Sequence, residues 1–244
     1  CTTSGCSSAG GTLTLTADDA AFDGQPYDDA SWSTSNWSGT TVAENTPITY
    51  EEKTGENTFT QFSGAPTKAG DYRANITVDG VTATKEFKIS RATITLNSGD
   101  FDVVLPNDPD YDGQPKTVAK VEFKSDSKKQ WFGKITVKYR GEDGSEVTNP
   151  TNAGTYTVVL DVAAGGGYEA VSNIDGWTFT IRQAEQTLSY ATTEVSKTYG
   201  DGTFTNELTR TAVHGNVTYA SGNTGVATVN ATTGEVTIVS AGTT

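Results

Sequence analysis

The sequence predicts an all-β protein built from tandem β-sandwich domains, and three observations lead to this prediction. Hydrophobic residues make up only 34% of the 244 residues, and they occur in short runs that alternate with polar residues, the pattern of half-buried strands. Residues that favour such pleated surfaces, above all threonine, recur throughout the chain. Several motifs also appear twice in the same order. A chain of this length can bury two or three separate cores.

The repeated motifs lie at nearly constant distances from each other. The pairs are FDGQP (22–26) and YDGQP (111–115), ITY (48–50) and VKY (137–139), PTKAGDYRANITV (66–78) and PTNAGTYTVVLDV (150–162), and EFKISRATITL (86–96) and TFTIRQAEQTL (178–188). Distances of 89, 89, 84 and 92 residues are typical of duplicated domains that differ by loop insertions. We interpret residues 163–176 as such an insertion in the second copy, where the first copy has a short turn at Asp79–Gly80.

Short strands separated by turn residues are expected inside each repeat. The clearest strands are expected at Thr93–Leu96, Lys134–Tyr139, Thr155–Val162 and Trp177–Gln183. About seven strands in about 80–90 residues is the spacing expected of a β-sandwich. TLTL at 12–15 aligns with TITL at 93–96 as the first strand of each repeat.

We therefore predict three domains behind a tether. The ranges are a flexible N-terminal tether at 1–11, sandwich domains at 12–91 and 92–183, and a third domain at 184–244. The short linkers between the domains predict that they stand end to end as an elongated rod.

The two repeats resemble the MBG family, immunoglobulin-like modules found in tandem on bacterial surface proteins, which implies tandem immunoglobulin-like β-sandwiches. The motifs that carry the resemblance are YDGQP, the tyrosine that ends the middle strand, PTNAGTYTV and the terminal FTI. The third segment resembles the bacterial immunoglobulin-like group 2 (BIG2) family. Its matching residues are Tyr219, Ser221, Asn223, Val226, Ala227, Val229, Gly234, Val236 and 241–243. In that family one more strand follows AGT, so the third domain is expected to lack its last strand.

These resemblances imply a non-catalytic stalk or adhesin segment of a bacterial cell-surface protein or surface filament. The implied partners are neighbouring domains of the same surface protein or other copies of the chain, with a glycan or host surface as a further candidate. One alternative is a filament subunit assembled by strand donation, in which residues 9–18 would place Leu13 and Leu15 in another copy. Use of this strand in its own domain is the competing interpretation.

The N-terminal segment contains both cysteines of the chain, Cys1 and Cys6. Because the sequence holds no methionine, we expect a mature protein whose leader was removed or a fragment of a longer one. Cys1 is a candidate for the lipid-bearing first residue of a bacterial lipoprotein. The alternative is that the two cysteines are incidental or close a small disulfide loop. Both alternatives agree with an extracellular protein.

An acidic segment raises the question of a metal site. Asp108, Asp110 and Asp112 have the spacing that opens a calcium-binding loop. The twelfth position of such a loop needs a carboxylate, and Ala119 stands there. The first repeat keeps DGQP without this spacing, so we interpret the segment as a turn, with weak calcium binding left open and no metal site assigned.

Catalysis and nucleic-acid binding are not expected. The single histidine, His214, has no partner for a metal pair, and no nucleophile or phosphate-loop motif occurs. A net charge of −13 and a pI near 4.4 would repel a phosphate backbone. No run is long and apolar enough for a transmembrane segment. We expect no enzyme activity, no cofactor and no catalytic residues.

Exposed tryptophans give the last candidate, a carbohydrate-binding module. Trp32, Trp37 and Trp131 lie in polar, irregular surroundings, where their rings could stack on sugars. The competing interpretation is that they cover the ends of their own sandwiches, as Trp177 is expected to pack in a core. Lys–Asn crosslinks are also left open, because no spacing identifies a pair.

Overall fold

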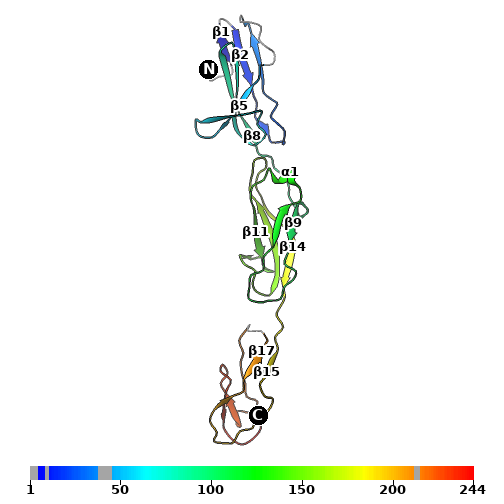
Figure 1. Ribbon diagram of the computed structural model, residues 1–244, viewed down its shortest axis with the longest axis vertical. Helices are drawn as coiled ribbons and strands as arrows, with labels where there is room; N and C mark the ends of the chain where they lie inside the picture. Colours follow the sequence, from blue (N-terminus) through cyan, green and yellow to red (C-terminus); the bar gives the residue numbers. More distant parts are fainter. Residues whose placement is uncertain (1–4, 9–10, 38–45, 212–214) are drawn as a thin grey trace. The chain divides into compact units, whose positions relative to one another are not determined.

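The computed structural model of the chain (Figure 1) describes residues 5–8, 11–37, 46–211 and 215–244, and of Gly5–Ser8 only the backbone. The chain forms two compact units. The first consists of Cys1–Asn107, Thr117–Pro150 and Thr155–Phe179, and the second of Asp108–Lys116, Thr151–Gly154 and Thr180–Thr244. Most of the sequence predicted as domains 12–91 and 92–183 therefore lies in the first unit. The segment predicted as the third domain lies in the second.

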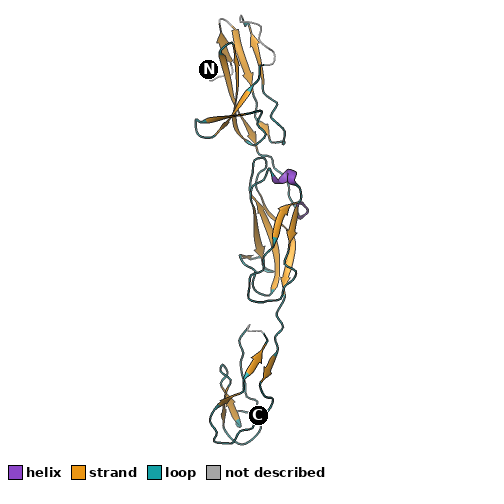
Figure 2. Ribbon diagram, viewed as in Figure 1, coloured by secondary structure: helices purple, strands orange, loops and turns teal. Residues whose placement is uncertain are grey.

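The protein is mostly β, with several small, mainly antiparallel sheets (Figure 2). The strands are β1 (Gly5–Ser8), β2 (Gly11–Thr16), β3 (Ala20–Ala21), β4 (Ser31–Ser35), β5 (Thr49–Lys53), β6 (Phe59–Phe62), β7 (Gly70–Val78), β8 (Val81–Ser90), β9 (Phe101–Val104), β10 (Lys120–Phe123), β11 (Ile135–Arg140), β12 (Glu146–Val147), β13 (Gly154–Val162), β14 (Val171–Ile181), β15 (Leu188–Tyr190), β16 (Phe204–Thr205), β17 (Leu208–Arg210), β18 (Ala227–Val229) and β19 (Glu235–Ile238). Helical structure among the described residues is limited to the four-residue α1 (Asp126–Lys129) and a 3-10 turn, η1 (Ser98–Asp100).

The first repeat has two sheets that share one buried core. The five-stranded sheet has the order β3-β8-β7-β5-β6, and the three-stranded sheet has the order β1-β2-β4. Successive residues of a strand point to opposite faces, so the alternation in β7 puts one apolar set on the inner face. The core residues are Leu13, Leu15, Ala17, Phe22, Tyr27, Tyr50, Tyr72, Ala74, Ile76, Val78, Ala83, Phe87 and Ile89. Both sheets contribute to this set, with Leu13 and Leu15 from β2.

The second repeat has a four-stranded sheet, β12-β11-β13-β14, and a β9–β10 pair. Strand β13 is buried along most of its length, with Val158, Val159 and Leu160 fully covered. From the β9–β10 pair, Phe101 and Phe123 pack against each other, with ring centroids 4.7 Å apart and planes tilted by 33°. Trp177 on β14 meets Phe101 edge to face, so this tryptophan contacts a buried ring, as the sequence predicted.

The two repeats share the register of one strand pair, β5–β7 and β11–β13, and the arrangement of three aromatic rings. Tyr50 lies opposite Ala74, and the corresponding Tyr139 lies opposite Val158. Strands β7 and β13 each have nine residues and begin at the glycine of PTxAG. In the first repeat, the Tyr72 and Phe87 rings are stacked, with centroids 5.7 Å apart at 29°.

In the second repeat, the corresponding rings of Tyr156 and Phe179 are 5.6 Å apart at 27°. The third ring, Tyr50 or Tyr139, meets the phenylalanine edge to face at 6.1 Å in both repeats. The sequence repeat is therefore also a repeat of structure.

The structure corrects one predicted strand and its alignment. Thr93–Leu96 form no strand; next to them, Ala92 makes an isolated bridge to Tyr168. In the second repeat β9 pairs with β10 as β2 pairs with β4 in the first, and both strands are shifted by about 89 residues. TLTL therefore corresponds to β9 rather than to TITL. Alternating segments look alike in sequence, and only the partner strand distinguishes them.

The insertion in the second repeat is shorter than predicted. Strand β14 begins at Val171, so residues 171–176 extend the strand instead of forming a loop. The segment that replaces the two-residue turn Asp79–Gly80 of the first repeat is Ala163–Ala170. We call Ala163–Ala170 the glycine loop.

The predicted tether at 1–11 contains a strand. Residues 1–4 and 9–10 lie outside the described residues, but Gly5–Ser8 form β1 and pair with β2. Strand β2 is used within its own repeat, because Leu13 and Leu15 both have an exposed fraction of 0%. The segment considered for strand donation therefore fills the core of its own chain.

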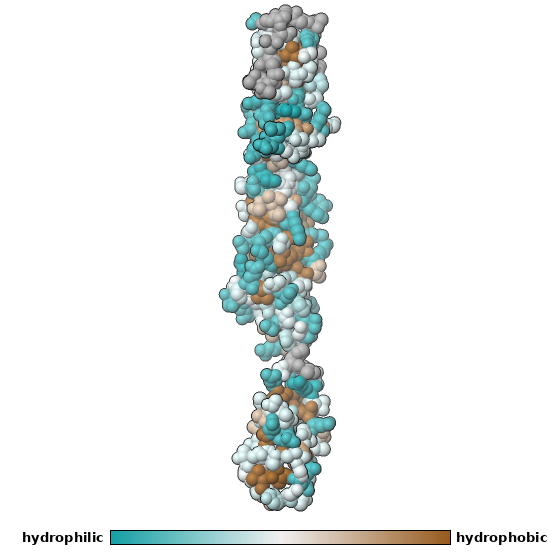
Figure 3. Space-filling model, turned by 90° about the vertical axis from the view of Figure 1, so that its left-hand side faces the viewer, coloured by the Kyte–Doolittle hydropathy of each residue, from teal (hydrophilic) through white to brown (hydrophobic). Residues whose placement is uncertain are grey.

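The third segment, residues 184–244, has short strands and little buried apolar surface. Its sheets are β15-β17 and β16-β19-β18. Strands β18 and β19 form a hairpin in which Asn230 Oδ1 accepts hydrogen bonds from the N–H groups of Thr232 and Thr233. Among the described residues beyond Gln183, Ala227 is the only buried hydrophobic residue. The exposed large hydrophobic residues of the third segment are Leu188, Tyr190, Val195, Tyr199 and Val239. Figure 3 shows hydrophobic residues at the surface of this segment.

Truncation of the shared phenylalanine should destabilise each repeat separately. We expect Phe87→Ala and Phe179→Ala each to cost about 3–5 kcal/mol, because each removes the ring that both tyrosines contact. Hydrogen exchange measured by mass spectrometry should show faster exchange in β5, β7 and β8 for the first variant, and in β11, β13 and β14 for the second. Lys88→Ala, an exposed change on the other face of β8, should stay within about 0.5 kcal/mol. If exchange stayed slow in the strands around either truncated ring, the proposed role of that phenylalanine in the core of its repeat would be contradicted.

Candidate functional site

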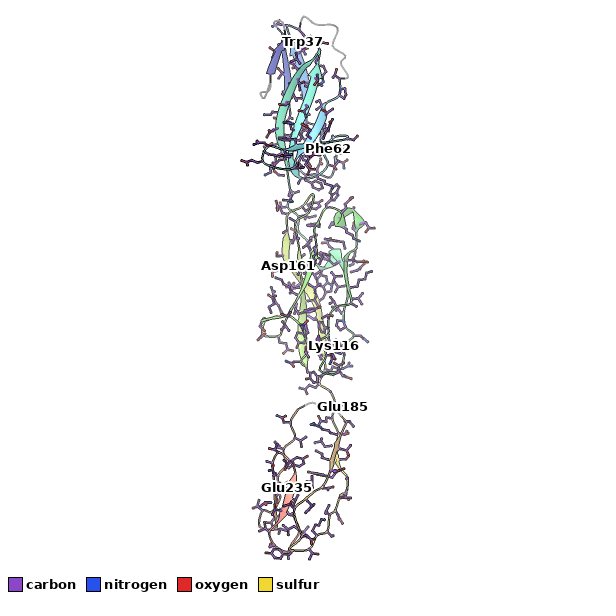
Figure 4. The ribbon with its side chains drawn as sticks, turned by 60° about the vertical axis from the view of Figure 1, so that its left-hand side comes forward. Trp37, Phe62, Lys116, Asp161, Glu185 and Glu235 are labelled. Atoms are coloured by element: carbon purple, nitrogen blue, oxygen red, sulfur yellow. The ribbon has the colours of Figure 1, made fainter. Side chains whose placement is uncertain are left out.

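All three candidate tryptophans pack against the core of the first repeat, two of them from within that repeat. Trp32 on β4 lies opposite Leu15 on β2, so both side chains face the core. Trp37 follows β4, and its Nε1–H donates to Asp79 Oδ2 at 2.9 Å in the β7–β8 turn. Both tryptophans are half-buried. The sequence predicted irregular polar surroundings for both tryptophans, whereas Trp32 lies within strand β4. Trp37 is labelled in Figure 4.

The third candidate, Trp131, lies far from Trp37. It follows α1 and packs against Phe22 of the first repeat, with ring centroids 4.9 Å apart. Phe22 N–H donates to Ser90 O, at the end of β8, whereas Trp37 is bound at the beginning of β8. A strand of this length spans roughly 30 Å at about 3.3 Å per residue. The structure therefore does not bring Trp37 and Trp131 onto one sugar-binding face.

The acidic DGQP motif forms the same turn in both repeats. Asp23 Oδ1 accepts from Gln25 N–H at 2.8 Å, and Asp112 Oδ1 accepts from Gln114 N–H at 2.9 Å. The intervening glycines have φ of 82° and 76°, which favours glycine. The residue before each motif also donates its N–H to the end of the last strand, Phe22 to Ser90 O and Tyr111 to Arg182 O. The motif is therefore a structural turn that joins the ends of its repeat.

The three aspartates of the calcium-like segment bind separate protein partners. Asp108 Oδ1 accepts the N–H of Thr180, and Asp110 pairs with Arg182 at 2.9 Å. Asp112 Oδ2 pairs with Lys116 at 2.6 Å, and this hydrogen bond, followed by that from Gln114 N–H, lowers the pKa of Asp112. Groups of three or more metal-ligating side chains are not found in the part of the chain that the structure describes. These partners support the interpretation of the segment as a turn.

Asp23 also borders a small cavity. The cavity measures about 240 Å³ and is lined in part by Tyr27, Asp28 and Asp29. Small-molecule sites usually occupy about 300–1,000 Å³ and have mainly apolar walls. Burial and then the charge of Asp29 raise the pKa of Tyr27 to about 12, and its hydroxyl donates to Asp18 O. Tyr27 is thus a neutral structural group at neutral pH.

One lysine lies beside an acid and an asparagine, the set required for a Lys–Asn crosslink. Lys138 Nζ is 2.8 Å from Asp161 Oδ2, and Asn173 N–H donates to Asp161 Oδ1 at 2.8 Å. The Lys138 side chain is 39% exposed, and the hydrogen bond to Asp161 raises its pKa. An amine attacks only in its neutral form, which burial without a carboxylate partner would favour. Lys138 and Asp161 therefore form a surface ion pair. Asp161 is labelled in Figure 4.

Other sequence candidates fall where the structure gives no description. His214 and Cys1 lie outside the described residues. The described part of the chain contains no helix with the length and apolarity needed to cross a bilayer. Sequence reasoning missed Phe22 and Tyr168, whose rings meet at 5.3 Å. The available signal was the run of three glycines just before Tyr168.

The ion pair of Lys138 with Asp161 should depend on pH. The hydrogen bond from Lys138, then that from Asn173 N–H, lowers the pKa of Asp161 below its usual value, near 3.9 when unfolded. The stabilisation is therefore present above about pH 4 and is lost as the pH falls through the folded pKa. A double-mutant cycle with Lys138→Met and Asp161→Asn should show coupling at pH 7 that disappears at about pH 2. Coupling of equal size at both pH values would contradict an ionic interaction.

No family model and no curated protein matches the chain. Its function is therefore inferred from its residues and their geometry.

Proposed function

We propose that the chain is a non-catalytic structural segment, a stalk or adhesin segment, of a bacterial cell-surface protein. Its two repeats would be MBG-like immunoglobulin sandwiches and its third segment a BIG2-like domain. The motifs quoted from the sequence support the bacterial surface setting and an extracellular location. The end-to-end order of the domains stays a prediction.

The observation that carries the proposal is the conservation of core geometry between the repeats. Register, ring stacking and the DGQP turn agree closely between the copies, although most other side chains differ. The charged groups vary freely: Glu51, for example, pairs with Arg73 in the first repeat, where the second has Arg140 and Thr157. This pattern is expected of modules selected for stable folding and repetition.

The path of the chain through the first repeat suits a protein under tension. An added Cβ on Gly11 would lie 2.7 Å from Trp37 Cα, and Trp37 binds the turn at Asp79. Strand β2 therefore begins at the end where β8 begins, and β1 before it runs back along β2, with Gly5 opposite Thr14. The chain leaves after Ser90, at the far end of β8. A pull along the chain would act along the strands and load many ladder hydrogen bonds at once.

The second repeat has the same kind of path. Ala92 O accepts from Glu169 N–H at 3.0 Å, so the chain enters beside the residues that precede β14. It leaves at the end of β14, an eleven-residue strand about 35 Å long at about 3.3 Å per residue. From β2 onward, the first repeat thus begins and ends at opposite ends of its last strand, as the second repeat does, which supports a load-bearing role.

Single-molecule pulling tests this proposal. In a background with Cys1→Ser and Cys6→Ser, handles at the two chain ends should first peel the edge strand β1 from β2 and then load the rest of the first repeat in shear. A control with handles at Thr12→Cys and Thr82→Cys would pull from one end of the sheet and peel its strands apart. We expect a clearly higher unfolding force for the end-to-end pull. Equal forces in the two geometries would remove the mechanical basis of the proposal.

A further inference from the structure

The glycine loop of the second repeat contacts the first repeat through a cluster of aromatic rings. Phe22 is only 6% exposed, and its ring meets Trp131 at 4.9 Å and Tyr168 at 5.3 Å, edge to face in both pairs. Tyr168 in turn stacks on Phe132 at 4.9 Å, and Phe132 stacks on Phe123 at 5.4 Å. Edge-to-face and offset-stacked rings at these distances attract each other beyond their burial. Phe22 is thus continuous with the aromatic core of the next repeat.

Three consecutive carbonyl groups of the glycine loop accept hydrogen bonds from the first repeat and its exit segment. The donors and acceptors are Arg91 Nε to Gly165 O at 2.7 Å, Ala69 N to Gly166 O at 2.7 Å, and Ala92 N to Gly167 O at 2.9 Å. Glu169 N–H returns a bond to Ala92 O. Backbone groups bonded in this way fix both position and direction, because each bond requires near-linear geometry.

Two of the three glycines are required by space. A Cβ on Gly165 would lie 2.4 Å from the Trp131 oxygen, and one on Gly167 would lie 2.4 Å from the Phe22 ring. The Phe22 ring has little room to move, because Trp131 and Tyr168 flank it. A Cβ on Gly166 would meet only Lys68 Cδ at 3.5 Å, which is ordinary van der Waals contact. The loop therefore has a position that forbids a side chain next to one that accepts it.

The loop is an addition to the repeat rather than part of its fold. The corresponding position in the first repeat is the turn Asp79–Gly80, where a Cβ on Gly80 would meet nothing within 4 Å. Closing the β13–β14 hairpin requires only such a turn. The additional residues of the glycine loop are directed at the preceding repeat.

We propose that the glycine loop is a fixed joint, which locks the first repeat to the second so that the two move as one body. The inference extends the proposed stalk, because a locked joint transmits tension between repeats without a swivel. Its partner surface is built from Phe22, Ala69, Arg91 and Ala92 of the same chain. The first repeat and most of the second form one compact unit, in agreement with such a lock.

Matched glycine variants test the joint. Spin labels at Lys88→Cys and Thr136→Cys, both exposed, report the distance between the repeats in the Cys1→Ser, Cys6→Ser background. We expect a single narrow distance for the parent protein and for Gly166→Ala. Gly167→Ala should give a broad distribution, and the Ala69 and Ala92 amides should lose their hydrogen-exchange protection. A broad distribution in the parent, or a Gly167→Ala distribution as narrow as that of Gly166→Ala, would overturn the proposal.

Local unfolding is distinguished by exchange in the two cores. In Gly167→Ala, amides of β7, β8, β13 and β14 should keep their protection, so that only the joint opens. If the second core is also lost, Phe22→Ala decides, because it removes the ring without crowding the loop and should give the same broad distribution. A narrow distance in Phe22→Ala would count against the joint. A narrow spin-label distance in the parent protein, together with equal unfolding forces in the two pulling geometries, would support the fixed joint and contradict the proposed stalk.

Discussion

The stacked tyrosine–phenylalanine pair is the contact on which each repeat depends. Tyr72 joins β7 to Phe87 of β8, and its hydroxyl donates to Lys68 O, within the PTKAG turn. Burial, followed by the charges of Glu52 and Asp71, raises the pKa of Tyr72 to about 12, so this bond persists at neutral pH. One side chain thus connects the core to the turn that starts its strand. In the second copy, Tyr156 stands at the same distance from its PTxAG glycine and stacks on Phe179 in the same way.

The sequence was informative where periodicity and repetition agreed. Strands β11 and β13 lie close to their predicted bounds, because strict alternation and the flanking turn residues left little choice. TITL, in contrast, alternates just as well and forms no strand. Its alternation says which residues could share a face but not which partner strand is available. The start of β14 was missed because Ser172 and Asn173 are polar and resemble a loop.

Candidate sites were predictable by residue type but not by neighbourhood. The tryptophans have the size and amphipathic character that a sugar-binding face requires. Trp32, however, packs against the core, opposite Leu15. The aspartates near YDGQP have the residue type of a metal site, but each accepts a hydrogen bond from a protein donor. That donor is either distant in sequence or part of the turn itself. In the third segment, Leu188 and Tyr190 alternate like core residues but are 54% and 52% exposed. Local pattern reports the potential for burial, and only tertiary structure realises it.

The glycine loop shows why the two copies differ most at the ends of their strands. Glycine costs roughly 0.5–1 kcal/mol relative to alanine through lost backbone freedom, so three in a row are unfavourable unless contacts offset them. The carbonyls of Gly165, Gly166 and Gly167 each accept a bond from the first repeat or its exit segment, at roughly 1 kcal/mol net each, and Phe22 adds ring contacts. The offset exists only when the preceding repeat is present. A tandem array therefore leaves its core unchanged and builds its specificity into the loops where repeats meet, because loops tolerate insertion and cores do not.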